Sequence, residues 1–152
     1  LGDKALVLRT SWLHGKHGVN FVATMVRLFG ELESLKVVND QFGSPTWVGW
    51  LAEVILDLGR TQASGIVNVA NAGVTSWFDF ANTIYDLVSP NITNLKVKEI
   101  LPQTSEQMQR PAKRPKYSVL DCTKLRGLLG RELMTWQDGL KAHLNELGLI
   151  GG

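Results

Sequence analysis

Short apolar runs that alternate with amphipathic helical stripes most constrain what this chain can fold into. Residues 5–8 form an apolar run, followed after Arg9 by a loop that contains Gly15 and Gly18. This pattern predicts a buried strand of a parallel sheet over 5–9. Residues 20–29 then carry apolar side chains at helical spacing, which predicts a helix ended by Gly30. Strands and helices that alternate in this way define an α/β protein.

The rest of the chain continues this alternation. Its patterns predict strands over 35–38, 65–70 and 96–101, and polar loops over 40–46 and 102–115. They predict helices over 48–58, 76–88 and 136–147, and a short helix that starts at Asp121 or Thr123 and ends near Gly130. Two of the helices begin with capping signals, Thr75 or Ser76 ahead of Asp79, and Thr135 ahead of Asp138. The expected order of elements is therefore β-α-β-α-β-α-β-α-α.

The composition excludes several classes of protein. The chain has 152 residues, of which 44% are hydrophobic and 20% charged, as in one ordinary globular domain and unlike a disordered chain. No apolar run approaches the roughly 20 residues that span a bilayer, and no signal-peptide pattern opens the chain. Cys122 is the single cysteine, which excludes a disulfide framework within one chain. We expect a cytoplasmic protein that does not bind a membrane.

Positive charge is concentrated in one segment. Residues 110–126 contain six positive side chains and one negative side chain, Asp121, whereas the rest of the chain carries a net charge of −3. A local basic cluster on a slightly acidic body suits a small anionic ligand better than nucleic acid, which requires a broader basic face. A solvated, irregular loop explains the same pattern.

No reaction centre is visible in the sequence. A Gly-x-Gly-x-x-Gly motif, a phosphate-loop lysine motif and a nucleophile-elbow serine are all absent. Tyr85 and Tyr117 each lack a lysine four residues later, so neither can form a tyrosine–lysine proton-transfer pair within one helical turn. The sequence therefore predicts no catalytic residue of its own.

The histidines do not indicate a metal site. His14 and His17 have no third ligand nearby in the sequence, so we expect exposed loop histidines, and we expect His143 on the surface of the last helix. The Gly15–Gly18 loop lies between a strand and a helix, where its amides could meet a phosphate. An ordinary turn is the better explanation of two glycines.

Three strings resemble the dTDP-4-dehydrorhamnose reductase family of extended short-chain dehydrogenases/reductases. They are LRTSW at 8–12, NDQFGSPT at 39–46 and AKRPKYSVLD at 112–121, in the family's order and spacing. The string GIVNVA at 65–70, with Ser76 and Trp77 after it, also resembles the family's strand and following helix. The resemblance extends from about Ala5 to Leu147.

The resemblance implies an activity and a missing half. The family reduces the 4-keto group of dTDP-4-dehydro-6-deoxy-L-mannose with NADPH, giving dTDP-L-rhamnose for cell-surface glycans. The family's glycine-rich cofactor loop and Tyr-x-x-x-Lys pair lie in an N-terminal half. Residues 1–152 are thus expected to be the C-terminal, substrate-binding part of a Rossmann-type protein, with mixed short strands and helices, and inactive alone. Exposed strand edges and apolar surface would then favour self-association.

The resemblance also implies a site for the dTDP-sugar. Trp12 is implied beside the sugar, where the indole covers a deoxysugar face, although a core tryptophan at a strand end is the structural alternative. Arg114 is implied on the diphosphate, with Lys113 assisting and Ser118 in the same string. The other implied contacts are Asn20, Phe21, Gln41, Ser44 and Thr46. Helix capping explains the first of these equally well, and turn chemistry explains the last three.

The remaining tryptophans are expected to be packing residues. Trp47, Trp50, Trp77 and Trp136 lie within or beside helical apolar patterns. At position 14 the family often has tyrosine, so the histidine of this chain leaves any contact of that side chain open.

Two other functions remain open. One is a non-catalytic binding subunit similar to the regulatory subunit of methionine adenosyltransferase, which shares the fold and acts through protein–protein contact. The other is a related nucleotide-sugar epimerase, with a different reaction in the same pocket. A Tyr-x-x-x-Lys helix and a glycine-rich loop ahead of residue 1 would support the reductase.

Overall fold

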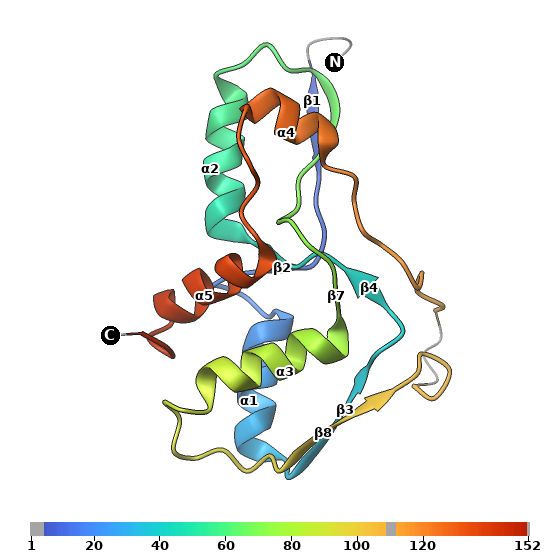
Figure 1. Ribbon diagram of the computed structural model, residues 1–152, viewed down its shortest axis with the longest axis vertical. Coiled ribbons are helices and arrows are strands. Elements are labelled where there is room, and N and C mark those ends of the chain that lie inside the picture. The colour runs from blue at the N-terminus through green and yellow to red at the C-terminus, as the bar shows by residue number, and fades with distance from the viewer. Residues whose placement is uncertain (1–4, 109–111, 152) are drawn as a thin grey trace.

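The structure, a computed structural model, describes residues 5–108 and 112–151 (Figure 1). Its elements are β1 (Leu6–Arg9), β2 (Leu13–His14), α1 (Phe21–Glu31), β3 (Ser34–Val38), β4 (Phe42–Gly43), β5 (Thr46–Trp47), α2 (Val48–Gly59), β6 (Gly65–Asn68), β7 (Thr75–Ser76), α3 (Trp77–Val88), β8 (Glu99–Gln103), α4 (Thr123–Leu129) and α5 (Trp136–Glu146). The longer elements confirm the predicted order. Arg110, a member of the predicted basic cluster, lies outside the described residues.

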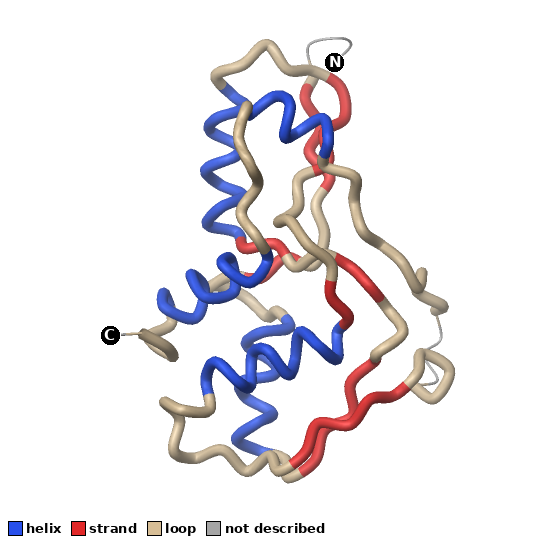
Figure 2. The backbone as a smooth tube through the Cα atoms, viewed as in Figure 1, coloured by secondary structure: helices blue, strands red, loops and turns tan. Residues whose placement is uncertain are grey.

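The strands form four two-stranded sheets (Figure 2). β1–β6, β2–β5 and β3–β8 are parallel, whereas β4–β7 is antiparallel. Val7 of β1 pairs with Ile66 of β6, and their side chains are 51% and 49% exposed. The prediction of a buried parallel strand over 5–9 is therefore right about the pairing and wrong about the burial. One face of the β1–β6 pair has no cover from the described residues.

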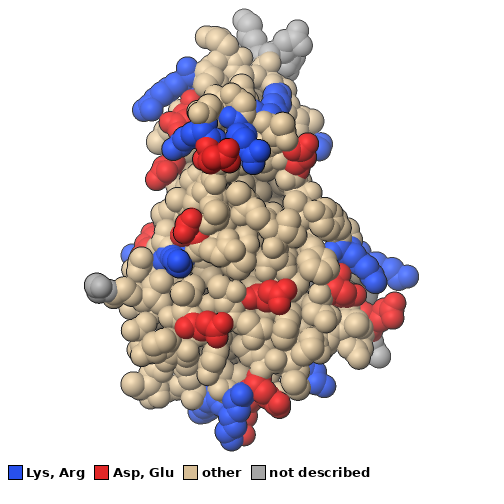
Figure 3. Space-filling view, in the orientation of Figure 1, with Lys and Arg blue, Asp and Glu red and all other residues tan. Residues whose placement is uncertain are grey.

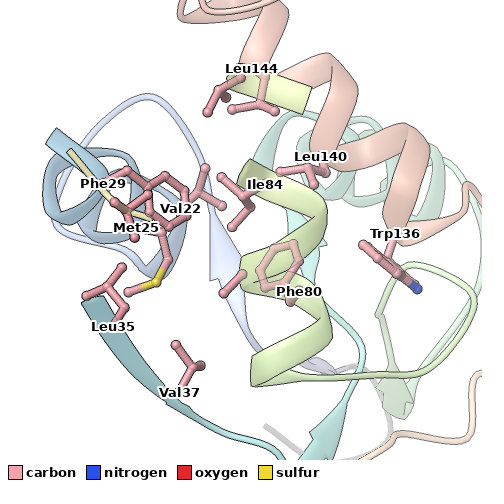
Figure 4. Packing of buried hydrophobic residues seen from close by; sticks show 13 residues of the cluster. Val22, Met25, Phe29, Leu35, Val37, Phe80, Ile84, Trp136, Leu140 and Leu144 are labelled. Carbon is pink, nitrogen blue, oxygen red and sulfur yellow. The ribbon is translucent and has the colours of Figure 1, made fainter. Parts of the chain in front are cut away.

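Two apolar cores hold the elements together. The first joins α1, α3 and α5 with β3, and it contains Phe29, Phe80, Ile84 and Leu140, all at most 1% exposed. Figure 4 shows the α3 side chains of this core lying between those of α1 and those of α5. The second core joins α2 and α4 with β6, at the other end of the molecule (Figure 1). Each fully buried side chain of this size contributes about 1.5–3 kcal/mol.

The helix caps are as predicted. Ser76 Oγ accepts a hydrogen bond from the amide of Asp79 at 3.0 Å, and Thr135 Oγ1 accepts one from the amide of Asp138 at 3.1 Å. Each bond satisfies one amide that the first helical turn leaves unpaired. α4 ends at Leu129, and its C-cap is Gly130, whose φ of 61° is left-handed and favours glycine.

Three boundaries differ from the predictions. α1 continues through Gly30 to Glu31. The strand predicted over 96–101 is β8, which begins only at Glu99. The amides of Lys96 and Val97 instead donate to the carbonyl of Phe29, in the last turn of α1. The loop predicted over 40–46 contains β4 and the first residue of β5. β4 pairs with β7 and β5 pairs with β2, and most of the segment is buried.

Candidate functional site

A cavity of about 350 Å³ opens where four distant segments of the chain meet. It is lined by Trp12, Gln41, Trp77, Arg114, Pro115 and Ser118. The volume lies at the lower end of the range for small-molecule sites, about 300–1,000 Å³. Trp12, Gln41 and Arg114, which come from the three family-like strings, thus meet in one place. Ser118 of the third string lies there too.

Two stacked tryptophans form one wall of the cavity. The ring centroids of Trp12 and Trp77 lie 3.5 Å apart, with an angle of 7° between the planes. Trp77 packs against the first core, as predicted, and its partly buried ring also lines the cavity. Trp47, Trp50 and Trp136 are packed in the two cores as predicted.

Hydrogen bonds fix the polar groups of the cavity. Gln41 is 7% exposed, and its Nε2 donates to Ser105 Oγ at 2.8 Å. Ser105 Oγ in turn donates to Asp40 Oδ1 at 2.7 Å, and this bond is the main reason that the pKa of Asp40 is lowered. Ser118 Oγ donates to the carbonyl of Phe42 at 3.0 Å. The amide and the hydroxyl are therefore held in fixed orientations beside the aromatic wall.

The predicted basic cluster is divided in space. Arg114 is exposed and lines the cavity, and its neighbour Lys113 is exposed beside it. Lys116 Nζ lies 3.7 Å from Oδ2 of Asp40, between β3 and β4. Lys124 donates to two main-chain carbonyls at the start of β6. Arg126 forms an ion pair with Glu132. Figure 3 shows the Lys and Arg side chains of one face at separate places. Of these cations, Arg114 alone lines the cavity.

Four predicted contact residues lie behind the cavity or away from it. Asn20 caps α1 by accepting from an amide of its first turn at 3.1 Å. Phe21 packs against Trp77, with ring centroids 4.5 Å apart. Ser44 is 3% exposed and donates to the carbonyl of Gly73 at 2.6 Å, and Thr46 is fully buried in β5. Their contacts are structural in this arrangement.

Two histidines are buried against each other, so both predictions of exposed rings are wrong. His14 and His143 are 1% and 0% exposed, and their Nδ1 atoms lie 3.0 Å apart. Burial, and then the proximity of His143, lowers the pKa of His14 to about 3. Burial also lowers the pKa of His143. The helical spacing from Trp136 and Leu140 to His143 could have indicated that this ring faces the core.

The glycine loop and the metal-ligating side chains were the two places where the sequence left a phosphate or metal contact open. The loop from Gly15 to Gly18 is filled by the chain itself: Asn20 Nδ2 donates to the carbonyl of Gly15 at 2.8 Å, and Val48 lies against Gly15. Within the described ranges there is no group of three or more metal-ligating side chains. In the same ranges, no helix has the length and apolar character needed to cross a membrane.

The fold and the cavity define an α/β domain with a cavity of small-molecule size. Residues 1–149 match the RmlD substrate binding domain, and the chain belongs to this family. It is 37% identical to dTDP-4-dehydrorhamnose reductase of Aggregatibacter actinomycetemcomitans over 93% of this chain and 50% of that protein. It is 38% identical to a probable dTDP-4,6-dihydroxy-2-methyloxan-3-one 4-ketoreductase of Streptomyces antibioticus over 90% of this chain and 45% of that protein.

A solved structure shows the same fold. The crystal structure of dTDP-4-dehydrorhamnose reductase from Bacillus anthracis in complex with NADP matches with a TM-score of 0.84 and 41% identity, over 93% of this chain and 48% of that chain. The family predicted from the sequence strings is therefore confirmed. The chain spans about half the length of the relatives that it matches.

Proposed function

We propose that this chain is the nucleotide-sugar-binding half of a dTDP-4-dehydrorhamnose reductase in dTDP-L-rhamnose biosynthesis. The observation that carries the proposal is the cavity that joins the Trp12–Trp77 wall to the guanidinium of Arg114. A planar guanidinium can bind a diphosphate through two parallel hydrogen bonds. The Trp12–Trp77 wall borders the space next to Arg114 where the deoxysugar would lie. The cavity thus offers one contact for the deoxysugar and one for the neighbouring diphosphate of a dTDP-deoxysugar.

The polar groups of the cavity suit the sugar. Gln41 and Ser118 lie in the same cavity as Arg114, where an amide and a hydroxyl can form hydrogen bonds with sugar hydroxyl or keto oxygens. Lys113 adds a second positive charge beside Arg114. The two relatives above are named for different dTDP-linked keto sugars. We assign the 4-keto sugar linked to dTDP as the substrate class and dTDP-4-dehydro-6-deoxy-L-mannose as the substrate.

The reduction itself needs a second half. NADPH supplies the hydride in such a reduction, and the residues described here hold neither a dinucleotide cradle nor a proton-transfer pair. The half-exposed Val7 and Ile66 on the β1–β6 pair offer an apolar face for a cofactor-binding half. Relatives about twice as long as this chain support that assignment. In this arrangement the present chain binds and orients the nucleotide sugar.

Binding of dTDP to the full chain tests the proposal. We expect dTDP to stabilise the protein against thermal unfolding, by about 2.7 kcal/mol at a hundredfold excess over Kd. Arg114→Ala should weaken dTDP binding by about tenfold or more, since a hydrogen bond to a charged group contributes about 1.5–3 kcal/mol. Lys141→Ala, which removes an exposed positive charge from α5, is the matched control. Equal stabilisation of wild type and Arg114→Ala by dTDP would exclude Arg114 as the diphosphate ligand.

A further inference from the structure

One face of the Trp12 indole is covered by Trp77. The two rings are almost parallel and their centroids are 3.5 Å apart, which is van der Waals contact over most of the ring. Trp12 is also the one described residue other than glycine with a positive φ, at 48°. Side-chain-bearing residues adopt this left-handed conformation rarely, so surrounding contacts must hold it. The carbonyl of Trp12 accepts from the amide of Thr46 at 3.1 Å, which fixes the main chain.

The opposite face of the indole is covered by the main chain of Gly43. A Cβ placed on Gly43 would lie nearest to Trp12 Cε2, and 2.6 and 2.7 Å from two of the three atoms bonded to it, Cζ2 and Nε1. An approach in the ring plane would bring it nearer to those neighbours than to Cε2, so Gly43 lies over the ring. On the Trp77 side the same point would meet Trp77 atoms at least as closely. Its nearest atoms all belong to Trp12, so Gly43 lies on the other face.

Trp77 is itself held by the core. Its ring packs against Phe21 at 4.5 Å and lies 6.5 Å from the ring of Phe80, which is 1% exposed. Trp77 is the first residue of α3, and its neighbour Ser76 caps that helix. Contacts from two helices therefore fix the ring that supports Trp12.

From this geometry we propose that Trp77 is a positioning residue that clamps Trp12 against Gly43 and leaves only the indole edge for the ligand. The proposal deepens the proposed function and rests on it for the identity of the sugar. The edge of an aromatic ring carries partial positive charge, whereas its faces are negative. The clamped indole therefore selects an oxygen-bearing rim of the sugar, such as a hydroxyl or keto oxygen. This contact departs from the face-on cover of a deoxysugar that the sequence implied for Trp12.

The test separates the sugar from the nucleotide. The full chain is compared with Trp77→Ala, which removes the clamp, and Trp77→Phe, which restores a ring. Trp50→Phe, in the other core, controls for the loss of a tryptophan. Calorimetry measures the Kd of dTDP and of dTDP-L-rhamnose. We expect Trp77→Ala to weaken dTDP-L-rhamnose by about two- to tenfold with little effect on dTDP, and Trp77→Phe to recover most of the loss.

A second measurement needs no ligand. In protein labelled with fluorotryptophan, the fluorine resonance of Trp12 is identified by its absence in Trp12→Phe. We expect this resonance to move towards that of a solvent-exposed indole in Trp77→Ala and to keep its position in Trp77→Phe and Trp50→Phe. An unchanged resonance in Trp77→Ala would overturn the clamp, and an equal loss of affinity for both ligands would overturn the edge contact with the sugar. Failure of wild type to bind either ligand would overturn the proposed function, while the resonance alone still decides the clamp.

Discussion

Mild acid should destabilise this protein through the buried pair of His14 and His143. Their Nδ1 atoms lie 3.0 Å apart, so one ring donates a hydrogen to the other. Neither Nε2 has a hydrogen-bond partner among the described residues. A proton added to the pair therefore places a charge in a buried site with few groups to compensate it. The groups that favour the charge are Glu146 and the main chain of Gly15, which act on His143 and are outweighed by burial.

The size of the effect follows from the pKa of His14. That pKa is lowered from 6.5 to about 3, first by burial and then by His143. In the unfolded chain the ring takes up a proton as the pH falls through 6.5, whereas the folded protein resists protonation down to about 3. The unfolded state thus binds more protons in this window, and stability falls with pH. Between pH 7 and 5, His14 alone lowers the free energy of unfolding by about 2 kcal/mol. The whole pKa shift corresponds to about 5 kcal/mol.

Urea unfolding at the two pH values measures this loss. Hydrogen bonds from Ser105 and Thr123 lower the pKa values of Asp40 and Asp121. These two carboxyls therefore remain charged between pH 7 and 5 and do not obscure the effect. The double variant His14→Phe/His143→Leu removes both buried rings and should lose most of the pH dependence. His17→Ala, which removes an exposed histidine, is the matched control and should keep the wild-type dependence.

Two results would refute the reasoning. If the free energy of unfolding of wild type is the same at both pH values, the buried rings do not resist protonation. If the double variant loses stability between the two pH values as wild type does, the proton uptake belongs to other groups. A lower stability of the double variant at both pH values would not affect the conclusion, because the comparison is between slopes.

Two further predictions concern activity and helix stability. The purified chain alone should not oxidise NADPH in the presence of a dTDP-4-keto sugar, because it contains neither a glycine-rich cofactor motif nor a tyrosine–lysine pair. The absorbance of NADPH measures this, and steady turnover would contradict the assignment. Ser76→Ala should lower the free energy of unfolding by about 1 kcal/mol, the usual contribution of an N-cap. Ser76→Thr should retain most of it in urea unfolding, and an alanine variant as stable as wild type would show that the bond from Asp79 contributes nothing.

The regular elements were predictable because their signals are local. α3 and α5 each begin at a hydroxyl that accepts from the amide three residues later, and each continues with apolar side chains at helical spacing. The strands β2, β4, β5 and β7 could not be predicted in this way. Each has two residues, which is too short for an alternating pattern, and each is defined by a partner elsewhere in the chain. A polar segment such as 40–46 can therefore be buried without any local sign.

The site was predictable only in part, for the same reason. Gln41 and Arg114 came from strings that resemble a family, and the structure brings them to one cavity. The burial of His14 depends on α5, since its partner His143 lies 129 residues away. No spacing near His14 carries that information. Trp77 belongs to an apolar helical pattern, and its second role follows from its place at the first turn of α3, where the ring reaches the end of the helix.

The sequence did not reveal the Trp12–Trp77 wall or the buried pair of His14 and His143, and the ring of Phe80 lies beside both. Phe80 of α3 lies 5.8 Å from the ring of His14 and 6.5 Å from that of Trp77. His14 follows Trp12 by two residues, so β2 leads from the cavity wall to the buried histidine pair. Closely packed cores transmit displacements because they contain few voids. A proton that the folded pair takes up near pH 3 would therefore place its charge beside the same aromatic cluster that holds Trp77 against Trp12.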